Sequence, residues 1–145
     1  MILFSSELEL IENNNCKMNK LIIDATGDKI FLMVINNDTN QKITYENSKV
    51  NYEKLILLIN DFLKSINLDL IKISKIYINR GPGSFAGIRN SLSIVKAIHL
   101  ANKIDYYCFS FRDFSLENEF EYENVPLLCE KFKVKKNLIN PIYLS

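Results

Sequence analysis

The strongest constraint on this chain is a cluster of glycines between a strand pattern and a helix pattern. Three of its four glycines and two of its three arginines fall within ten residues: Arg80, Gly81, Gly83, Gly87 and Arg89. Glycine permits a positive φ or a close backbone approach, and Pro82 fixes its own φ. The segment therefore predicts a tight turn that carries the chain from a strand directly into a helix.

The hydrophobic pattern on either side of this turn predicts an α/β fold. Residues 20–35 are typical of a β-hairpin, and QKITYE (residues 41–46) is typical of a third strand. The period then changes to that of a helix over residues 51–66, followed by a strand over 71–79, a helix over 85–102 and a strand over 104–111. This order of elements resembles the ribonuclease-H-like fold, a mixed sheet with helices.

Composition narrows the class of protein further. The chain of 145 residues is 48% hydrophobic and 24% charged, with a formal net charge of +1. These values fit a globular protein and argue against one that holds nucleic acid by charge alone. The three cysteines are odd in number and lack a C-x-x-C spacing, which predicts neither a disulfide framework nor a thiolate zinc site and favours the cytoplasm. A single histidine, His99, excludes two-histidine metal sites, so no metal is expected.

Both ends of the chain depart from the central pattern. Residues 1–17 begin with four apolar residues followed by acidic ones, which does not fit a signal peptide. We expect this extension to be disordered or a start-site artefact, with Met18 as the real start, and so to be dispensable. We expect residues 18–114 to form one lobe and residues 115–145 to form a reduced appendage.

Several functions are possible for the glycine cluster. A phosphate-binding P-loop needs a Gly-Lys pair that is absent here, and G-x-G-x-x-x-G is one residue longer than the dinucleotide fingerprint. A Ser84 nucleophile with His99 as its base is also a poor fit, because the two residues are separated by about 22 Å along one helix and cannot form a hydrogen bond. The plain alternative is a tight turn capped by Ser84.

The full string INRGPGSFAGIRNSLSIVKAI resembles the GPGSFTGLR segment of the TsaB family, in the Gcp-like branch of the actin and heat-shock ATPase fold. KLIIDATGDKIFLMVI is similar to the opening hairpin of that family, and PIYLS to its closing segment. The resemblance places the family's glycine-rich loop at Arg80, Gly81, Pro82, Gly83, Ser84, Phe85, Gly87 and Arg89. It also makes Asp24 a vestigial phosphate-loop acid, although an acid at the end of a hairpin strand is more often a turn former.

This sequence departs from the family at several positions. Val50-Asn51-Tyr52-Glu53 stands where the family has His-Ser-Glu, and Ala86 replaces a threonine. The resemblance implies that residues 115–145 are a reduced remnant of the second lobe, most of which is missing. A shortened form of this kind cannot complete a two-lobed nucleotide cleft.

The resemblance implies a function in tRNA modification. TsaB proteins pair with the catalytic subunit TsaD and with the ATPase TsaE, and the complex adds a threonylcarbamoyl group to N6 of adenosine 37 in tRNA. We therefore expect a non-catalytic scaffold that binds no cofactor and contacts tRNA only indirectly, while the complex uses ATP and threonylcarbamoyl-adenylate. The alternatives are a nucleotide-binding phosphotransferase, a glycoprotease-like protein, or a homodimer.

Surplus apolar residues on the two predicted helices point to a partner surface. Small residues at i,i+4 spacing on the second helix let another helix approach closely, and its two apolar stripes exceed what one sheet contact needs. The predicted interface comprises Leu55, Leu57, Leu58 and Phe62 on the first helix, and Ser91, Ile94, Ala97, Ile98 and Ala101 on the second.

Overall fold

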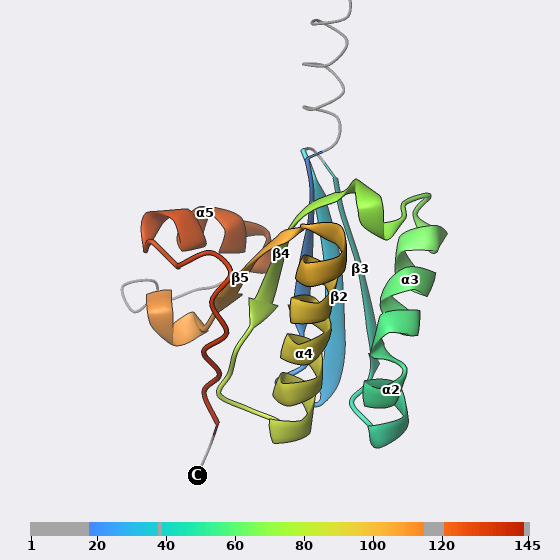
Figure 1. Ribbon diagram of the computed structural model, residues 1–145, viewed down its shortest axis with the longest axis horizontal. Coiled ribbons are helices and arrows are strands. Elements are labelled where there is room, and N and C mark those ends of the chain that lie inside the picture. The colour runs from blue at the N-terminus through green and yellow to red at the C-terminus, as the bar shows by residue number, and fades with distance from the viewer. Residues whose placement is uncertain (1–17, 38, 115–120, 144–145) are drawn as a thin grey trace, which may run out of the picture.

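A five-stranded mixed sheet forms the centre of the computed structural model, which describes residues 18–37, 39–114 and 121–143 (Figure 1). The strand order is β3-β2-β1-β4-β5. The strands β1 (Asn19–Asp24), β2 (Lys29–Asn36) and β3 (Thr39–Glu46) form an antiparallel meander. The strands β4 (Ile73–Asn79) and β5 (Asp105–Phe109) run parallel to β1. The predicted α/β class with a mixed sheet is confirmed.

Three helices lie on the first face of the sheet: α2 (Lys49–Glu53), α3 (Leu55–Ser65) and α4 (Phe85–Asn102). The prediction of a single helix over residues 51–66 is wrong in one detail: the structure has two helices there. The backbone leaves helical geometry at Lys54, where φ is −101° and ψ is 8°. The Ser48 hydroxyl accepts a hydrogen bond from the backbone N–H of Asn51 and so caps the short helix α2. A 3-10 turn over Leu70–Lys72 then leads into β4.

The residues of the core between these helices and the sheet are those that the strand and helix patterns of the sequence predict: alternate residues along the strands, and residues three or four apart along the helices. Alternate residues of β1 and β4, such as Leu21, Ile23 and Ile76, are fully buried on this face. The helices contribute residues at spacings of three and four: Leu55, Ile59, Phe62 and Leu63 from α3, and Ile88, Leu92, Val95 and Ile98 from α4. Each such side chain contributes about 1.5–3 kcal/mol to folding.

The second face of the sheet is covered by the C-terminal part of the chain. Two 3-10 turns, Phe111–Phe114 and Tyr122–Asn124, precede the helix α5 (Val125–Lys131). Phe114, Val125, Leu128 and Cys129 pack with the opposite set of strand residues, Ile22, Met33, Tyr77 and Phe109. The described residues beyond Glu121 thus belong to the same packed unit as the sheet, while their origin as a remnant of a second lobe stays a prediction.

Residues 1–17 and 115–120 lie outside the described ranges, so the prediction made for the N-terminal extension is not tested by the structure. Within the described ranges, no helix combines the length and apolar character needed to cross a bilayer.

Candidate functional site

The glycine-rich segment joins β4 to α4 at the carboxyl ends of two adjacent parallel strands. Ile23 of β1 is in register with Ile78 of β4, so the next residues, Asp24 and Asn79, end their strands side by side. Both polar side chains are buried, with 5% and 4% of their surfaces exposed. A buried polar group needs hydrogen-bond partners, and this pair is the centre of such a network.

Four donors surround the carboxylate of Asp24. Its Oδ1 accepts hydrogen bonds from the backbone N–H and the hydroxyl of Thr26, at 2.9 and 2.6 Å. Its Oδ2 accepts from Nδ2 of Asn79 at 2.9 Å and from the hydroxyl of Tyr122 at 2.5 Å. An ionised carboxylate offers about four acceptor positions. A cation could therefore bind Asp24 only by displacing one of these donors.

Tyr122 reaches Asp24 from the C-terminal part of the chain, 98 residues away in sequence. Its ring stacks on Phe31, with 4.2 Å between ring centroids. Burial, together with the neighbouring Asp24 carboxylate that it bonds, raises the pKa of the Tyr122 hydroxyl well above its usual value. The hydroxyl thus remains a proton donor to Asp24 and ties the C-terminal segment to the end of β1.

Two glycines of the segment allow α4 to pack directly on the turn after β1. A Cβ at Gly83 would overlap the carbonyl oxygen of Thr26 and lie 2.8 Å from its Cβ. A Cβ at Gly87 would overlap the carbonyl oxygen of Ala25 and lie 3.1 Å from its carbonyl carbon. In both cases the obstacle is backbone, which cannot move aside cheaply. The backbone N–H of Ser84 donates to the Thr26 carbonyl at 2.8 Å and locks the same contact.

Gly81 is required by the C-terminal segment that passes close to it. Its φ is +113°, a region that favours glycine, and a Cβ there would overlap the carbonyl oxygen of Ile142. Ile142 in turn donates its N–H to the carbonyl of Arg80 at 2.8 Å. The peptide bond between Gly81 and Pro82 is cis. The C-terminal segment around Ile142 thus packs against the glycine-rich loop.

Arg80 anchors this segment through its guanidinium group. Nη2 lies 2.7 Å from Oδ1 of Asp113, and Nη1 donates to the carbonyl of Asn140 at 3.0 Å. Asp113 also accepts from the backbone N–H of Ser110. Arg89, by contrast, is exposed on the first turns of α4. The two arginines of the motif therefore differ: Arg80 holds the fold, and Arg89 faces solvent.

Ser84 acts as the N-cap of α4. Its hydroxyl accepts from the backbone N–H of Gly87 at 3.2 Å and lies 2.8 Å from the hydroxyl of Tyr52. His99 is near the other end of α4, where its Nδ1 lies 2.9 Å from the carbonyl oxygen of Ile104. The 18-residue helix thus separates Ser84 from His99, and the structure does not bring them together.

The two described cysteines are core residues. Cys108 and Cys129 are each 2% exposed and unpaired by disulfides. Burial raises the pKa of both thiols to about 12, so neither provides a thiolate nucleophile near neutral pH. In the part of the chain that the structure describes, no group of three or more His, Cys, Asp or Glu side chains is arranged to hold a metal ion.

A comparison with sequence models of protein families shows which family the chain belongs to. The sequence model of the TsaD family, described as tRNA N6-adenosine threonylcarbamoyltransferase, matches residues 40–129, which is more than half of the sequence. The chain belongs to the TsaD family. No curated protein sequence matches the chain significantly.

Solved structures agree with this assignment at the level of the fold. YeaZ from Pseudomonas aeruginosa superposes with a TM-score of 0.59 and 18% identity, over 64% of this chain and 44% of that one. A structure titled an uncharacterized protein with similarity to peptidase YeaZ from Pseudomonas aeruginosa gives the same TM-score and identity, over 64% and 43%. This TsaD-family chain thus spans less than half the length of either. The resemblance to TsaB-type proteins and the actin-like, ribonuclease-H-like fold is confirmed.

The predicted partner interface of this TsaD-family chain divides into two groups. Leu55 and Ser91 are 0% exposed, and Phe62 and Ile98 are 3% and 4% exposed, because all four face the sheet. Their assignment to a partner surface was wrong. Leu57 is 58% exposed, Ala97 and Ala101 are exposed, and Leu58 and Ile94 are partly buried. These five, with the exposed Leu100, form what we call the α3–α4 surface.

Sequence reasoning missed three residues of the site: Tyr52, Asn79 and Tyr122. Asn79 could have been noticed, since a polar residue ending a buried strand beside Asp24 needs a partner. Tyr122 gave no such signal, because it sits in an acidic stretch far from Asp24 in sequence.

Proposed function

We propose that this chain is a non-catalytic scaffold in the synthesis of N6-threonylcarbamoyladenosine in tRNA, and that it binds and supports a TsaD-like catalytic subunit. Membership of the TsaD family supports the pathway. The saturated carboxylate of Asp24 is the observation that carries the scaffold role. The acid that would face a metal-bound phosphate is used instead to join β1, β4 and the Tyr122 segment.

The glycine segment supports the same role. Gly83 and Gly87 accommodate the backbone of the turn after β1, and Gly81 accommodates Ile142, so the three glycines serve packing within this chain. Ser84 serves as a helix cap. The motif thereby becomes a rigid junction that fixes the position of α4, one of the two helices that we assign to the partner.

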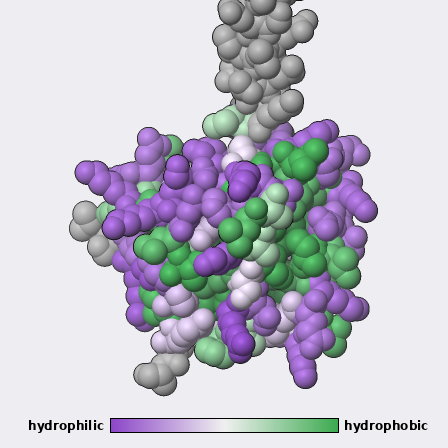
Figure 2. Space-filling view, viewed as in Figure 1, coloured by the Kyte–Doolittle hydropathy of each residue, from purple (hydrophilic) through white to green (hydrophobic). Residues whose placement is uncertain are grey.

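The α3–α4 surface is the docking site that we propose for the TsaD-like subunit. α3 and α4 contact each other on the first face of the sheet, and Figure 2 shows hydrophobic side chains gathered over them with hydrophilic ones around. Leu57 and Leu100 expose 58% and 64% of their surfaces there. Alanines at 97 and 101 leave room for the backbone of a partner helix to approach closely. An apolar surface of this kind is typical of a protein interface.

The remaining assignments follow from the scaffold role. ATP and threonylcarbamoyl-adenylate are then used by the complex rather than held by this chain, a TsaE-like ATPase joins through the catalytic subunit, and contact with tRNA is indirect. The two buried, unpaired cysteines support a reducing cytoplasm as its location.

The test is a binding measurement between this chain and the TsaD-like subunit from the same organism. Leu57→Asp places a charge at an exposed position, so the fold should survive. Burying that charge unpaired in the interface should cost several kcal/mol of association, which weakens binding more than a hundredfold.

Leu127→Asp is the matched control, because Leu127 is 68% exposed but lies on α5, across the sheet. The proposal expects this variant to bind as the unchanged chain does. Equal binding by both variants, or equal loss in both, would contradict the assignment of the interface to the α3–α4 surface.

A further inference from the structure

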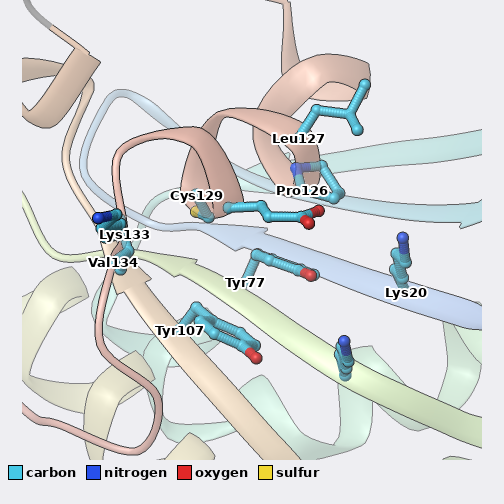
Figure 3. A pocket seen from close by; sticks show the side chains of 10 residues that line it. Lys20, Tyr77, Tyr107, Pro126, Leu127, Cys129, Lys133 and Val134 are labelled. Atoms are coloured by element: carbon cyan, nitrogen blue, oxygen red, sulfur yellow. The ribbon is translucent and has the colours of Figure 1, made fainter.

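A cavity of about 380 Å³ opens on the second face of the sheet, between the strands and α5 (Figure 3). Lys20, Lys75, Tyr77 and Tyr107 line it from the strands, and Glu130 and Lys133 from α5 and the residues after it. Lys20 and Lys75 lie near the amino ends of β1 and β4, opposite the ends that carry Asp24 and Asn79. The cavity is therefore separate from the glycine-rich junction.

Tyr77 supplies the cavity with a hydroxyl group that a ligand can bind. The residue is only 4% exposed, yet its hydroxyl has no hydrogen-bond partner among the described residues. Figure 3 shows the hydroxyl pointing into the space below α5. The hydroxyl is open to the cavity, so it is available to donate a hydrogen bond to a bound ligand. Burial also raises the pKa of Tyr77, which keeps this hydroxyl a donor.

The charges around the cavity select the kind of ligand. Three lysines, Lys20, Lys75 and Lys133, line the cavity together with one acid, Glu130. None of the three lysines forms an ion pair within the described ranges. The near-zero net charge of the chain hides this local excess. Lysines gathered in this way are suited to a phosphate group.

The rest of the cavity suits a planar ring. The half-buried ring of Tyr107 stacks on Tyr77 at 5.1 Å, and the Nζ of Lys75 lies 5.9 Å from its centroid. Aromatic side chains beside cationic ones are the combination that binds bases next to phosphates. The volume is within the usual range for small-ligand sites and exceeds what inorganic phosphate fills.

We propose that this cavity binds a nucleotide, with its phosphate between the lysines and its base and sugar against Tyr107, Tyr77 and α5. The nucleotide could come from a free nucleoside monophosphate or from a single strand of RNA, since both present the same chemistry. The inference does not depend on a TsaD-like partner, and its test uses this chain alone.

The experiment titrates the full chain with AMP, with a short single-stranded oligoadenylate and with inorganic phosphate, by isothermal calorimetry. Tyr77→Phe keeps the ring and removes only the hydroxyl, so it should leave the fold intact or slightly stabilised while weakening AMP binding about tenfold. Lys75→Met should weaken binding and reduce its salt dependence. Lys96→Met, an exposed lysine on α4 across the sheet, is the control and should change neither.

The outcomes separate the possibilities. Tighter binding of the oligoadenylate than of AMP, with competition between them, identifies RNA as the source, and binding of AMP alone identifies the free nucleotide. Phosphate binding as tight as AMP binding would overturn the nucleotide assignment. The proposal also fails if neither nucleotide probe binds at millimolar concentration, or if Tyr77→Phe and Lys75→Met bind like Lys96→Met.

Discussion

Gly87→Ala tests the packing of α4 on the turn after β1. In an ordinary helix this change stabilises by up to about 1 kcal/mol, because alanine has the higher helix propensity. Here the new methyl would overlap the Ala25 carbonyl oxygen and lie 3.1 Å from its carbon, so α4 or the turn must shift. Overpacking of this kind costs about 1–3 kcal/mol or more. We expect a net loss of stability of about 2 kcal/mol.

Thermal unfolding followed by circular dichroism measures this effect. A loss of about 2 kcal/mol lowers the Tm of a chain of this size by about 4–8 °C. Gly27→Ala is the matched control, since a Cβ at Gly27 would meet nothing within 4 Å, and it should shift stability by less than about 1 kcal/mol. A Gly87→Ala variant as stable as the unchanged chain, or more stable, would refute the reasoning about this junction.

Three further predictions follow from the same contacts. Tyr122→Phe removes one donor from the buried Asp24 and should cost about 1–3 kcal/mol in urea unfolding, whereas Tyr143→Phe, at an exposed position, should cost nothing measurable; equal costs would contradict the network. The raised pKa of Cys108 and Cys129 means that the folded state keeps their protons to higher pH than the unfolded state, whose thiols titrate near 9.0. Their contribution to stability should therefore be constant below about pH 9 and fall between about pH 9 and 12. A Cys108→Ala, Cys129→Ala variant should lose part of this slope, and an unchanged slope would count against it. The purified chain should hydrolyse neither ATP nor peptides; activity that co-purifies with it and disappears in Asp24→Ala would contradict the scaffold role.

The order and type of the elements could be predicted because hydrophobic periodicity reports local structure. Strands at 20–35 and 71–79 and a helix at 85–102 emerge from alternation and from three-to-four spacing. The break at Lys54 could not be predicted in this way, since no proline or glycine marks it and the apolar spacing continues across it.

The site was predictable only where a motif marked it. The glycine cluster indicated a close backbone approach, but not that its neighbours would be Thr26, Ala25 and Ile142. Helical spacing identified two apolar stripes on α4 without saying which faced the sheet, and so Ser91 and Ile98 were assigned to the wrong side. The bond from Tyr122 to Asp24 depends on tertiary packing across 98 residues, which no local pattern encodes.

The content of N6-threonylcarbamoyladenosine in tRNA, measured by mass spectrometry of nucleosides from cells depleted of this chain, tests the central claim most directly. We predict that the modified nucleoside falls sharply on depletion and returns when the chain or its Leu127→Asp variant is supplied, but not when Leu57→Asp is supplied. Unchanged modification after depletion would contradict a role in this pathway, and full rescue by Leu57→Asp would contradict the scaffold mechanism.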